Sequence, residues 1–151
     1  SHKIYTEAEM EARYETILEE YAKTLNIEAL TMSGMVRQDI LPSVSGYIAS
    51  LAEAVGSKRA VCKDLPCTAE VALIEKLSGL MDEAYEKVNT LDTVLADGKA
   101  ESHNALTTAT YYKDEIIPAM ESLRAVVDQM EVDTASDFWP YPSYGDLMFR
   151  V

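Results

Sequence analysis

The residue types that most often carry chemistry are sparse in this sequence and stand apart from one another. There are two histidines, His2 and His103. A di-metal site in a helical protein uses Glu-x-x-His pairs on two helices. His103 has Glu101 only two residues before it, which is the wrong spacing. We therefore expect His103 to be a surface residue in the first turn of a helix, and a metal-binding bundle enzyme is the weakest interpretation of this chain.

The two cysteines, Cys62 and Cys67, lie close together in a stretch that contains Pro66. A zinc site would need two more ligands, and the sequence places no such pair nearby. No histidine stands beside either thiol to act as a base, although Lys63 is close. We expect two loop thiols, with a local disulfide or a redox role as the alternatives. Two cysteines are too few for a disulfide scaffold, so a reducing, cytoplasmic compartment is expected.

The carboxylates and arginines also lack the grouping of an active site. Glu7, Glu9 and Glu11 form the Glu-x-Glu pattern that binds magnesium in some ATP enzymes. Residues two apart on a helix point about 200° away from each other, so a solvated helix face is expected instead. There is no glycine-rich phosphate loop and no nucleophile elbow. The arginines are all separated in sequence: Arg13, Arg37, Arg59, Arg124 and Arg150. The residues thus predict no catalytic, cofactor-binding or metal-binding position.

Composition narrows the class of protein. The chain has 151 residues, of which 48% are hydrophobic, which is enough for the core of one domain. A formal net charge of −13 argues against a nucleic-acid-binding module and against adhesion to an anionic membrane. No apolar run approaches the roughly 20 residues that a membrane span needs. Glycine (6) and proline (5) are scarce, which disfavours an all-β fold with its many turns.

Helical periodicity dominates the first third of the chain. Thr6 and Glu9 have the spacing of a capping box, and a helix is predicted over 7–25. A second helical pattern should carry a kink or a break near 38–42, where Pro42 removes a backbone donor, with helix on both sides, and should end at Gly56. The apolar positions expected to be buried are Met10, Tyr14, Ile17, Leu18, Tyr21 and Leu25 in the first stripe, and Ile27, Leu30, Met35, Ile40, Val44, Ile48, Leu51 and Val55 in the second.

A loop over 57–67 is expected to precede the most regular pattern in the chain. Thr68 should cap this third helix and Gly98 should end it. The last helix should start between Lys99 and Asn104 and bend at Pro118. The apolar stripe of the third helix is a strict heptad pattern formed by Ile74, Leu77, Met81, Ala84, Val88, Leu91 and Leu95. The apolar stripe of the last helix is formed by Leu106, Ala109, Tyr112, Ile116, Met120, Leu123, Val127 and Met130.

The C-terminal stretch has a different character. Residues 136–149 hold five of the twelve aromatic residues and fit neither a helical nor a strand period. Pro140-Tyr141-Pro142 could serve as a polyproline-type ligand for another protein. We favour packing within its own assembly, because Trp139 and Phe149 are large apolar surfaces. The predicted division is a tag remnant at 1–2, a helical bundle over 3–135 and an extended aromatic tail over 136–151. The fold class is all-α, an antiparallel bundle of about four long helices.

Three sets of residues resemble type III glutamine synthetases, of the glutamate–ammonia ligase family. The stretch ARYETILEEYAKTLNIEALTM at 12–32 is similar to the segment that follows the catalytic core in that family. Residues 40–42 (ILP) and 111–120 (YYKDEIIPAM) look like its later helices. WPYPSYGDLMF at 139–149 looks like its C-terminal signature.

The resemblance implies that this chain is the C-terminal portion of a longer enzyme. That family makes glutamine from glutamate, ammonia and ATP with a divalent metal (Mg), through γ-glutamyl phosphate, in large homo-oligomeric rings. In that family, the residues that bind ATP, metal and glutamate lie upstream of the matched region. No catalytic, cofactor-binding or metal-binding residue therefore carries over to this chain. We therefore expect a structural and assembly module packed on its own catalytic domain or on sister subunits. The alternative is a free-standing helical-bundle interaction or sensor module, which predicts a reading frame that begins near Lys3.

Overall fold

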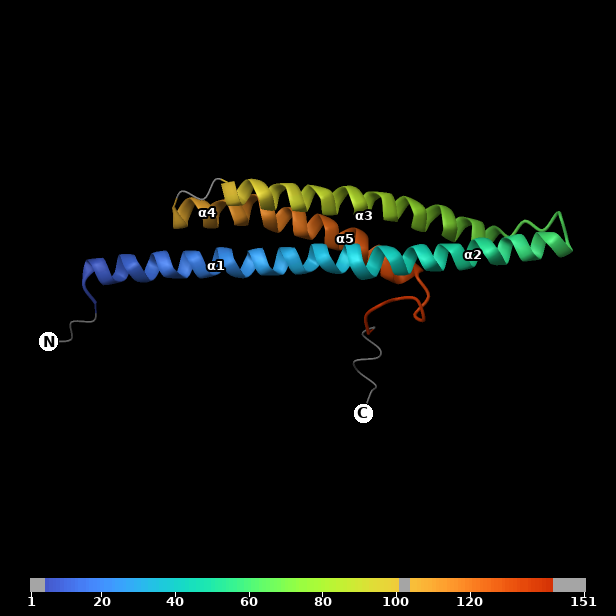
Figure 1. Ribbon diagram of the computed structural model, residues 1–151, viewed down its shortest axis with the longest axis horizontal. Coiled ribbons are helices and arrows are strands. Elements are labelled where there is room, and N and C mark those ends of the chain that lie inside the picture. The colour runs from blue at the N-terminus through green and yellow to red at the C-terminus, as the bar shows by residue number, and fades with distance from the viewer. Residues whose placement is uncertain (1–4, 101–103, 143–151) are drawn as a thin grey trace, which may run out of the picture.

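Three helical rods make up the chain in the computed structural model, which describes residues 5–100 and 104–142 (Figure 1). The described residues contain helices and no strand, which confirms the all-α class. Successive rods run antiparallel, so the first and the third are parallel to each other. None of the described helices is long and apolar enough to cross a lipid bilayer. The first rod consists of α1 (Glu7–Met35), η1 (Val36–Ile40) and α2 (Leu41–Val61). The second rod is α3 (Thr68–Ala100). The third rod consists of α4 (Ala105–Tyr111), η2 (Tyr112–Ile116) and α5 (Ile117–Asp133).

The first rod differs from the expected pair of separate helices. α1 and α2 are continuous through η1, so the described residues form three rods rather than about four. Asn26 does not interrupt the helix, because its side chain faces the third rod. There its Oδ1 accepts a hydrogen bond of 3.1 Å from the Tyr112 hydroxyl.

Each proline inside a rod follows a single wide turn. Within η1 and η2, hydrogen bonds reach back five residues, from Leu41 N–H to the Val36 carbonyl and from Ile117 N–H to the Tyr112 carbonyl. Pro42 and Pro118 come directly after these bonds. A proline ring clashes with the carbonyl four residues before it, and a π turn makes room for that ring without ending the helix. The kink expected near 38–42 is therefore a local widening of a continuous rod.

α3 supplies the centre of the core, because it packs against both α2 and α5. Its predicted stripe is confirmed at five positions that are almost completely buried. Two further positions, Ile74 and Met81, are half-buried. The buried stripe residues are Leu77, Ala84, Val88, Leu91 and Leu95, and they belong to one cluster with Val44, Ile116, Leu123 and Met130.

The predicted stripe of α1 is wrong over much of its length. Met10, Tyr14, Ile17 and Tyr21 are between 39% and 63% exposed, and Ile27, Leu30 and Met35 are also exposed. The buried residues of α1 are Ala22, Ala29 and Ser33, and Val36 at the start of η1 continues the seven-residue spacing of Ala22 and Ala29. Their small side chains let the neighbouring rod approach closely. Leu106 in the last predicted stripe is likewise exposed.

The expected helix ends at Gly56, Thr68 and Gly98 are also corrected. α2 continues past Gly56 to Val61, and its last turn is held by an ion pair between Lys58 and Glu70. The carbonyl of Cys67 accepts a hydrogen bond from Val71 N–H, so Cys67 is the cap of α3 and Thr68 lies inside the helix.

Gly98 lies inside α3 and is required by close packing rather than by a helix end. A Cβ atom there would come within 2.7 Å of the Tyr111 ring. The Tyr111 hydroxyl donates a hydrogen bond of 2.9 Å to the Val94 carbonyl of α3. The missing side chain thus lets the ring lie flat against the helix and reach its backbone.

The start of the aromatic C-terminal stretch folds back on the first rod. Residues 136–142 form no helix or strand. Phe138 packs on Tyr47 with ring centroids 5.3 Å apart, and Trp139 and Tyr141 pack against the core. The chain therefore docks in cis up to residue 142. Residues 143–151, like residues 1–2, lie outside the described residues, so the complete tail and the tag remnant stay predictions.

The central position of Leu91 gives a stability prediction. Leu91→Ala should lower the free energy of unfolding by about 3 kcal/mol, because a fully buried leucine leaves a cavity between the rods. Urea denaturation of the chain measures this change. Leu106→Ala is the matched control, since Leu106 is 54% exposed, and it should change stability by less than about 0.5 kcal/mol. Equal effects of the two variants would contradict the packing described.

The first turn of α1 gives a pH prediction. The Thr6 backbone N–H and hydroxyl both donate to the Glu9 carboxylate, and these hydrogen bonds lower the pKa of Glu9 below its ordinary value. Because the folded-state pKa is lowered, the contribution of this cap is present above the unfolded pKa and is lost as pH falls through the folded value. Thr6→Ala should raise the pKa of Glu9, as measured by NMR titration of its side chain. The Thr16 hydroxyl donates to the Ala12 carbonyl, so Thr16→Ala is the matched control and should leave the pKa of Glu9 unchanged.

Candidate functional site

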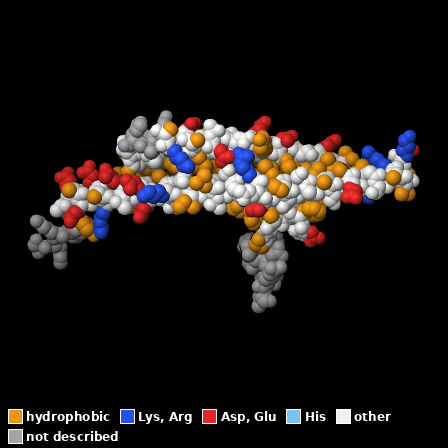
Figure 2. Space-filling model, in the orientation of Figure 1, with side chains coloured by type: hydrophobic (Ala, Val, Ile, Leu, Met, Phe, Trp, Pro, Cys, Tyr) orange, Lys and Arg blue, Asp and Glu red, His pale blue; other side chains and the backbone are white. Residues whose placement is uncertain are grey.

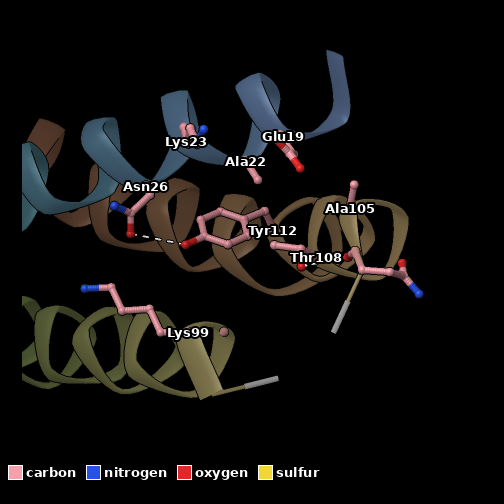
Figure 3. A pocket seen from close by; sticks show the side chains of 10 residues that line it. Glu19, Ala22, Lys23, Asn26, Lys99, Ala105, Thr108 and Tyr112 are labelled. Carbon is pink, nitrogen blue, oxygen red and sulfur yellow. Dashed lines mark hydrogen bonds between the residues drawn. The ribbon is translucent and has the colours of Figure 1, made fainter. Parts of the chain in front are cut away.

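A polar pocket of about 460 Å³ lies between the first rod, the end of α3 and the start of α4. Figure 3 shows its lining: Lys23 and Asn26 come from α1, Lys99 from α3, and Thr108 and Tyr112 from the third rod. Asn104 closes the pocket at the start of α4, where its side chain caps the helix by accepting from Thr107 N–H at 2.7 Å. The pocket therefore exists because two rods meet a helix terminus there.

The chemistry available in this polar pocket is hydrogen bonding. Burial raises the pKa of Tyr112, so its phenol stays protonated at neutral pH and donates to Asn26. A protonated phenol that is already engaged with an amide is a poor general base. In the described residues, no group of three or more His, Cys, Asp or Glu side chains is placed to hold a metal ion. The Tyr112–Asn26 hydrogen bond thus joins the first and third rods at this pocket.

A second polar cluster, centred on Arg37, ties η1 to α3. Arg37 donates to the Asp92 carboxylate through Nε (3.1 Å) and Nη2 (2.6 Å), and Nη2 also donates to Asn89 Oδ1 at 2.6 Å. The buried Ser33 hydroxyl donates to the other oxygen of Asp92 at 2.6 Å. The Arg37 guanidinium also lies 5.9 Å from the centre of the Tyr85 ring. These groups satisfy one another, so the cluster positions two rods rather than a ligand.

An apolar groove of about 640 Å³ runs between α1 and α5. Met32, Met35 and Met120 line it, and Trp139 and Tyr141 of the C-terminal stretch border it. The Tyr141 hydroxyl donates to Asp39 Oδ2 at 2.6 Å. Desolvation, together with this bond and the charge of Asp39, raises the pKa of Tyr141 to about 12. The phenol is therefore neutral at physiological pH and anchors the stretch to η1.

The residues considered from sequence are dispersed. Cys62 is exposed and Cys67 is buried, and both are free thiols, as expected, so the alternative of a local disulfide is not realised. Glu9 serves in the helix cap, while Glu7 and Glu11 are exposed. His103 lies outside the described residues. The prediction that the chain carries no catalytic, cofactor-binding or metal-binding residue stays a prediction.

The Arg37 cluster was missed from sequence. A usable signal exists, because Ser33 and Arg37 are one helical turn apart, as are Asn89 and Asp92. Polar pairs at that spacing beside an apolar stripe mark a face that another helix can bond. The signal does not say which two helices meet, and so it could not assign the partners.

Comparison with known proteins identifies the family. Residues 1–59 match the family model described as the glutamine synthetase C-terminal domain. A glutamine synthetase of Butyrivibrio fibrisolvens is 32% identical over 152 residues, covering 99% of this chain and 21% of the relative. The chain is homologous to the C-terminal domain of glutamine synthetases. The resemblance to the glutamine synthetase family is thereby confirmed.

Two further glutamine synthetases align over 97% of this chain at 25% identity. One is a type-3 glutamine synthetase of Dictyostelium discoideum and the other is a glutamine synthetase of Bacteroides fragilis (strain YCH46). The chain spans about a fifth of the length of these relatives, 20% and 21% respectively. The glutamine synthetase relationship therefore covers the three rods and leaves most of each relative outside the comparison.

The Arg37 cluster gives a prediction that separates bracing from incidental contact. A double-mutant cycle of Arg37→Ala and Asp92→Ala should give a coupling energy of about 0.5–1 kcal/mol, modest because both side chains are about one-third exposed. Arg37→Lys should lose most of this coupling, since lysine lacks the planar donors that reach both Asp92 and Asn89. Urea denaturation of the four chains measures it, and a coupling of zero would contradict the proposed tie.

Proposed function

We propose that this chain is a structural and assembly module at the C-terminal end of a type III glutamine synthetase and that it contributes no catalytic residue. The observation that carries the proposal is the alignment of nearly the whole chain with a glutamine synthetase of which it spans about a fifth. The Arg37 cluster and the Tyr112–Asn26 hydrogen bond support it, because these polar groups are engaged in joining helices.

The complete enzyme would make glutamine from glutamate, ammonia and ATP with a divalent metal such as Mg. These ligands would be held by parts of the polypeptide outside this chain. We further propose a cytoplasmic homo-oligomeric ring, with the enzyme's own catalytic domain and its sister subunits as the partners of the module. The net charge of −13 supports the exclusion of nucleic acid from those partners.

The C-terminal stretch has a bracing role in this proposal. Phe138 and Tyr141 attach it to α2 and η1 through Tyr47 and Asp39, and Trp139 packs against the core. In this proposal the bundle over 3–135 is the scaffold, and the tail over 136–151 packs on it and stabilises it. The tail would fix the relative positions of α1 and α5 on the two sides of the apolar groove, as the assembled enzyme needs them.

Removal of the C-terminal stretch tests this role. Deletion of residues 138–151 from the full-length enzyme should shift the oligomer to smaller species and lower ligase activity, because the contacts of Phe138, Trp139 and Tyr141 are lost. Sedimentation and a glutamine-formation assay measure the two effects. A truncation after Pro142 is the matched variant, since it retains these three side chains. Unchanged assembly and activity after deletion of 138–151 would contradict the structural role of the tail.

A further inference from the structure

The N-terminal half of α1 carries an apolar face that the described part of the chain leaves uncovered. Tyr14 is 54% exposed, Ile17 63% and Met10 61%, while Tyr21 is 39% exposed. Figure 1 shows that the first turns of α1 extend beyond the start of α4, where the other rods no longer run beside them. Soluble proteins rarely leave contiguous apolar side chains in water without a binding role.

The spacing of these residues indicates what kind of surface they form. Met10, Tyr14, Ile17 and Tyr21 follow steps of four, three and four residues. This is the a/d spacing of a helix that packs lengthwise against another helix. We call these four residues the α1 face. The same helix buries a different set, Ala22, Ala29 and Ser33, so the α1 face is additional to the core.

The charge around the α1 face restricts its occupant. Residues 7–20 contain six glutamates and one arginine, and Figure 2 shows acidic side chains gathered over this end of α1. Arg13 is turned toward the Tyr5 ring, 4.1 Å from its centre. A second copy of the chain would bring the same acidic border against this one. A surface with lysine and arginine around an apolar strip fits better, because opposite charges across an interface favour docking.

We infer that the α1 face docks on the catalytic part of the same synthetase subunit, through an apolar helix or groove bordered by basic side chains. This inference rests on the proposed function. In the relatives, the region matched here is preceded by most of the polypeptide, since the chain spans 21% of the Butyrivibrio protein at its C-terminal end. A segment tethered just before α1 has a high effective concentration at the α1 face, which favours it over a separate molecule.

Oxidation of Met10 in the full-length enzyme tests the docking directly. A thioether covered by a partner reacts slowly with hydrogen peroxide, and one in water reacts fast. Ile17→Asp places a charge in the α1 face and should speed Met10 oxidation by about tenfold, which corresponds to a loss of about 1.4 kcal/mol in docking free energy. Ile17→Leu should behave as the unchanged enzyme. Peptide mass spectrometry reads Met10 and, in the same sample, Met130, which is fully buried and reacts only if the bundle unfolds.

Two matched variants complete the experiment. Val132→Asp makes the same chemical change at a side chain of α5 that is 82% exposed and should leave Met10 protected. Reversal of the border charges by Glu11→Lys with Glu20→Lys should expose Met10 as Ile17→Asp does. Fast Met10 oxidation in the unchanged enzyme, equal to that in Ile17→Asp with Met130 still protected, would overturn the inference. Protection that disappears when subunits dissociate on dilution would also overturn it, because the occupant would then be another subunit.

The outcome for Met10 is independent of the outcome for the C-terminal deletion. An exposed Met10 together with loss of assembly on deletion of 138–151 would remove the α1 face from the account and leave the assembly role standing. A protected Met10 together with unchanged assembly would remove the assembly role of the tail and leave the docking of the α1 face standing.

Discussion

Burial of the α3 stripe is the interaction on which the rest of this structure depends. Leu77, Val88 and Leu91 lie between the first and the third rod and are fully buried, so both rods are held on the same helix. An amphipathic helix cannot bury such a stripe alone, and burial of apolar area is the main favourable contribution to folding. Hydrogen bonds also connect α3 to both of the other rods. Asp92 of α3 accepts from Arg37 of the first rod, and Lys87 of α3 donates to Ser122 of α5 at 2.7 Å.

The differing lengths of the rods explain why one end of the molecule is left open. The first rod is the longest, and its N-terminal turns lie beyond the part that α3 and the third rod can cover (Figure 1). The side chains there keep the apolar spacing of a packed helix although Met10, Tyr14 and Ile17 are more than half exposed in the described chain. A helix with this pattern is suited to a partner that approaches from outside the bundle. The proposed assembly role would use this open α1 face, which results from the uneven lengths of the rods.

The helical class and the α3 stripe could be predicted from sequence because both depend on periodicity within one helix. Thr6 and Glu9 were also predictable, since a capping box is local. The burial of Ala22, Ala29 and Val36 in place of Met10, Tyr14 and Ile17 could not be predicted, because the larger apolar residues give the stronger pattern. Which face is covered depends on where the other rods end, and no local pattern contains that information.

The two prolines and Gly98 show the same limit. A proline in a helical pattern predicts a kink or a break, and the sequence does not distinguish these from a π turn that keeps the rod continuous. Gly98 matched the signal for a helix end, whereas its actual requirement is contact with the Tyr111 ring of another rod. The Arg37 cluster could not be predicted, because its members come from two helices far apart in sequence.

The central claim is that these rods brace an enzyme and hold no reacting molecule. A cryo-electron microscopy map of the full-length enzyme with nucleotide bound tests it most directly. The account predicts that no side chain of this chain lies within hydrogen-bond distance of the nucleotide or its metal ion. Nucleotide seated in the polar pocket against Lys23 or Tyr112 would contradict it.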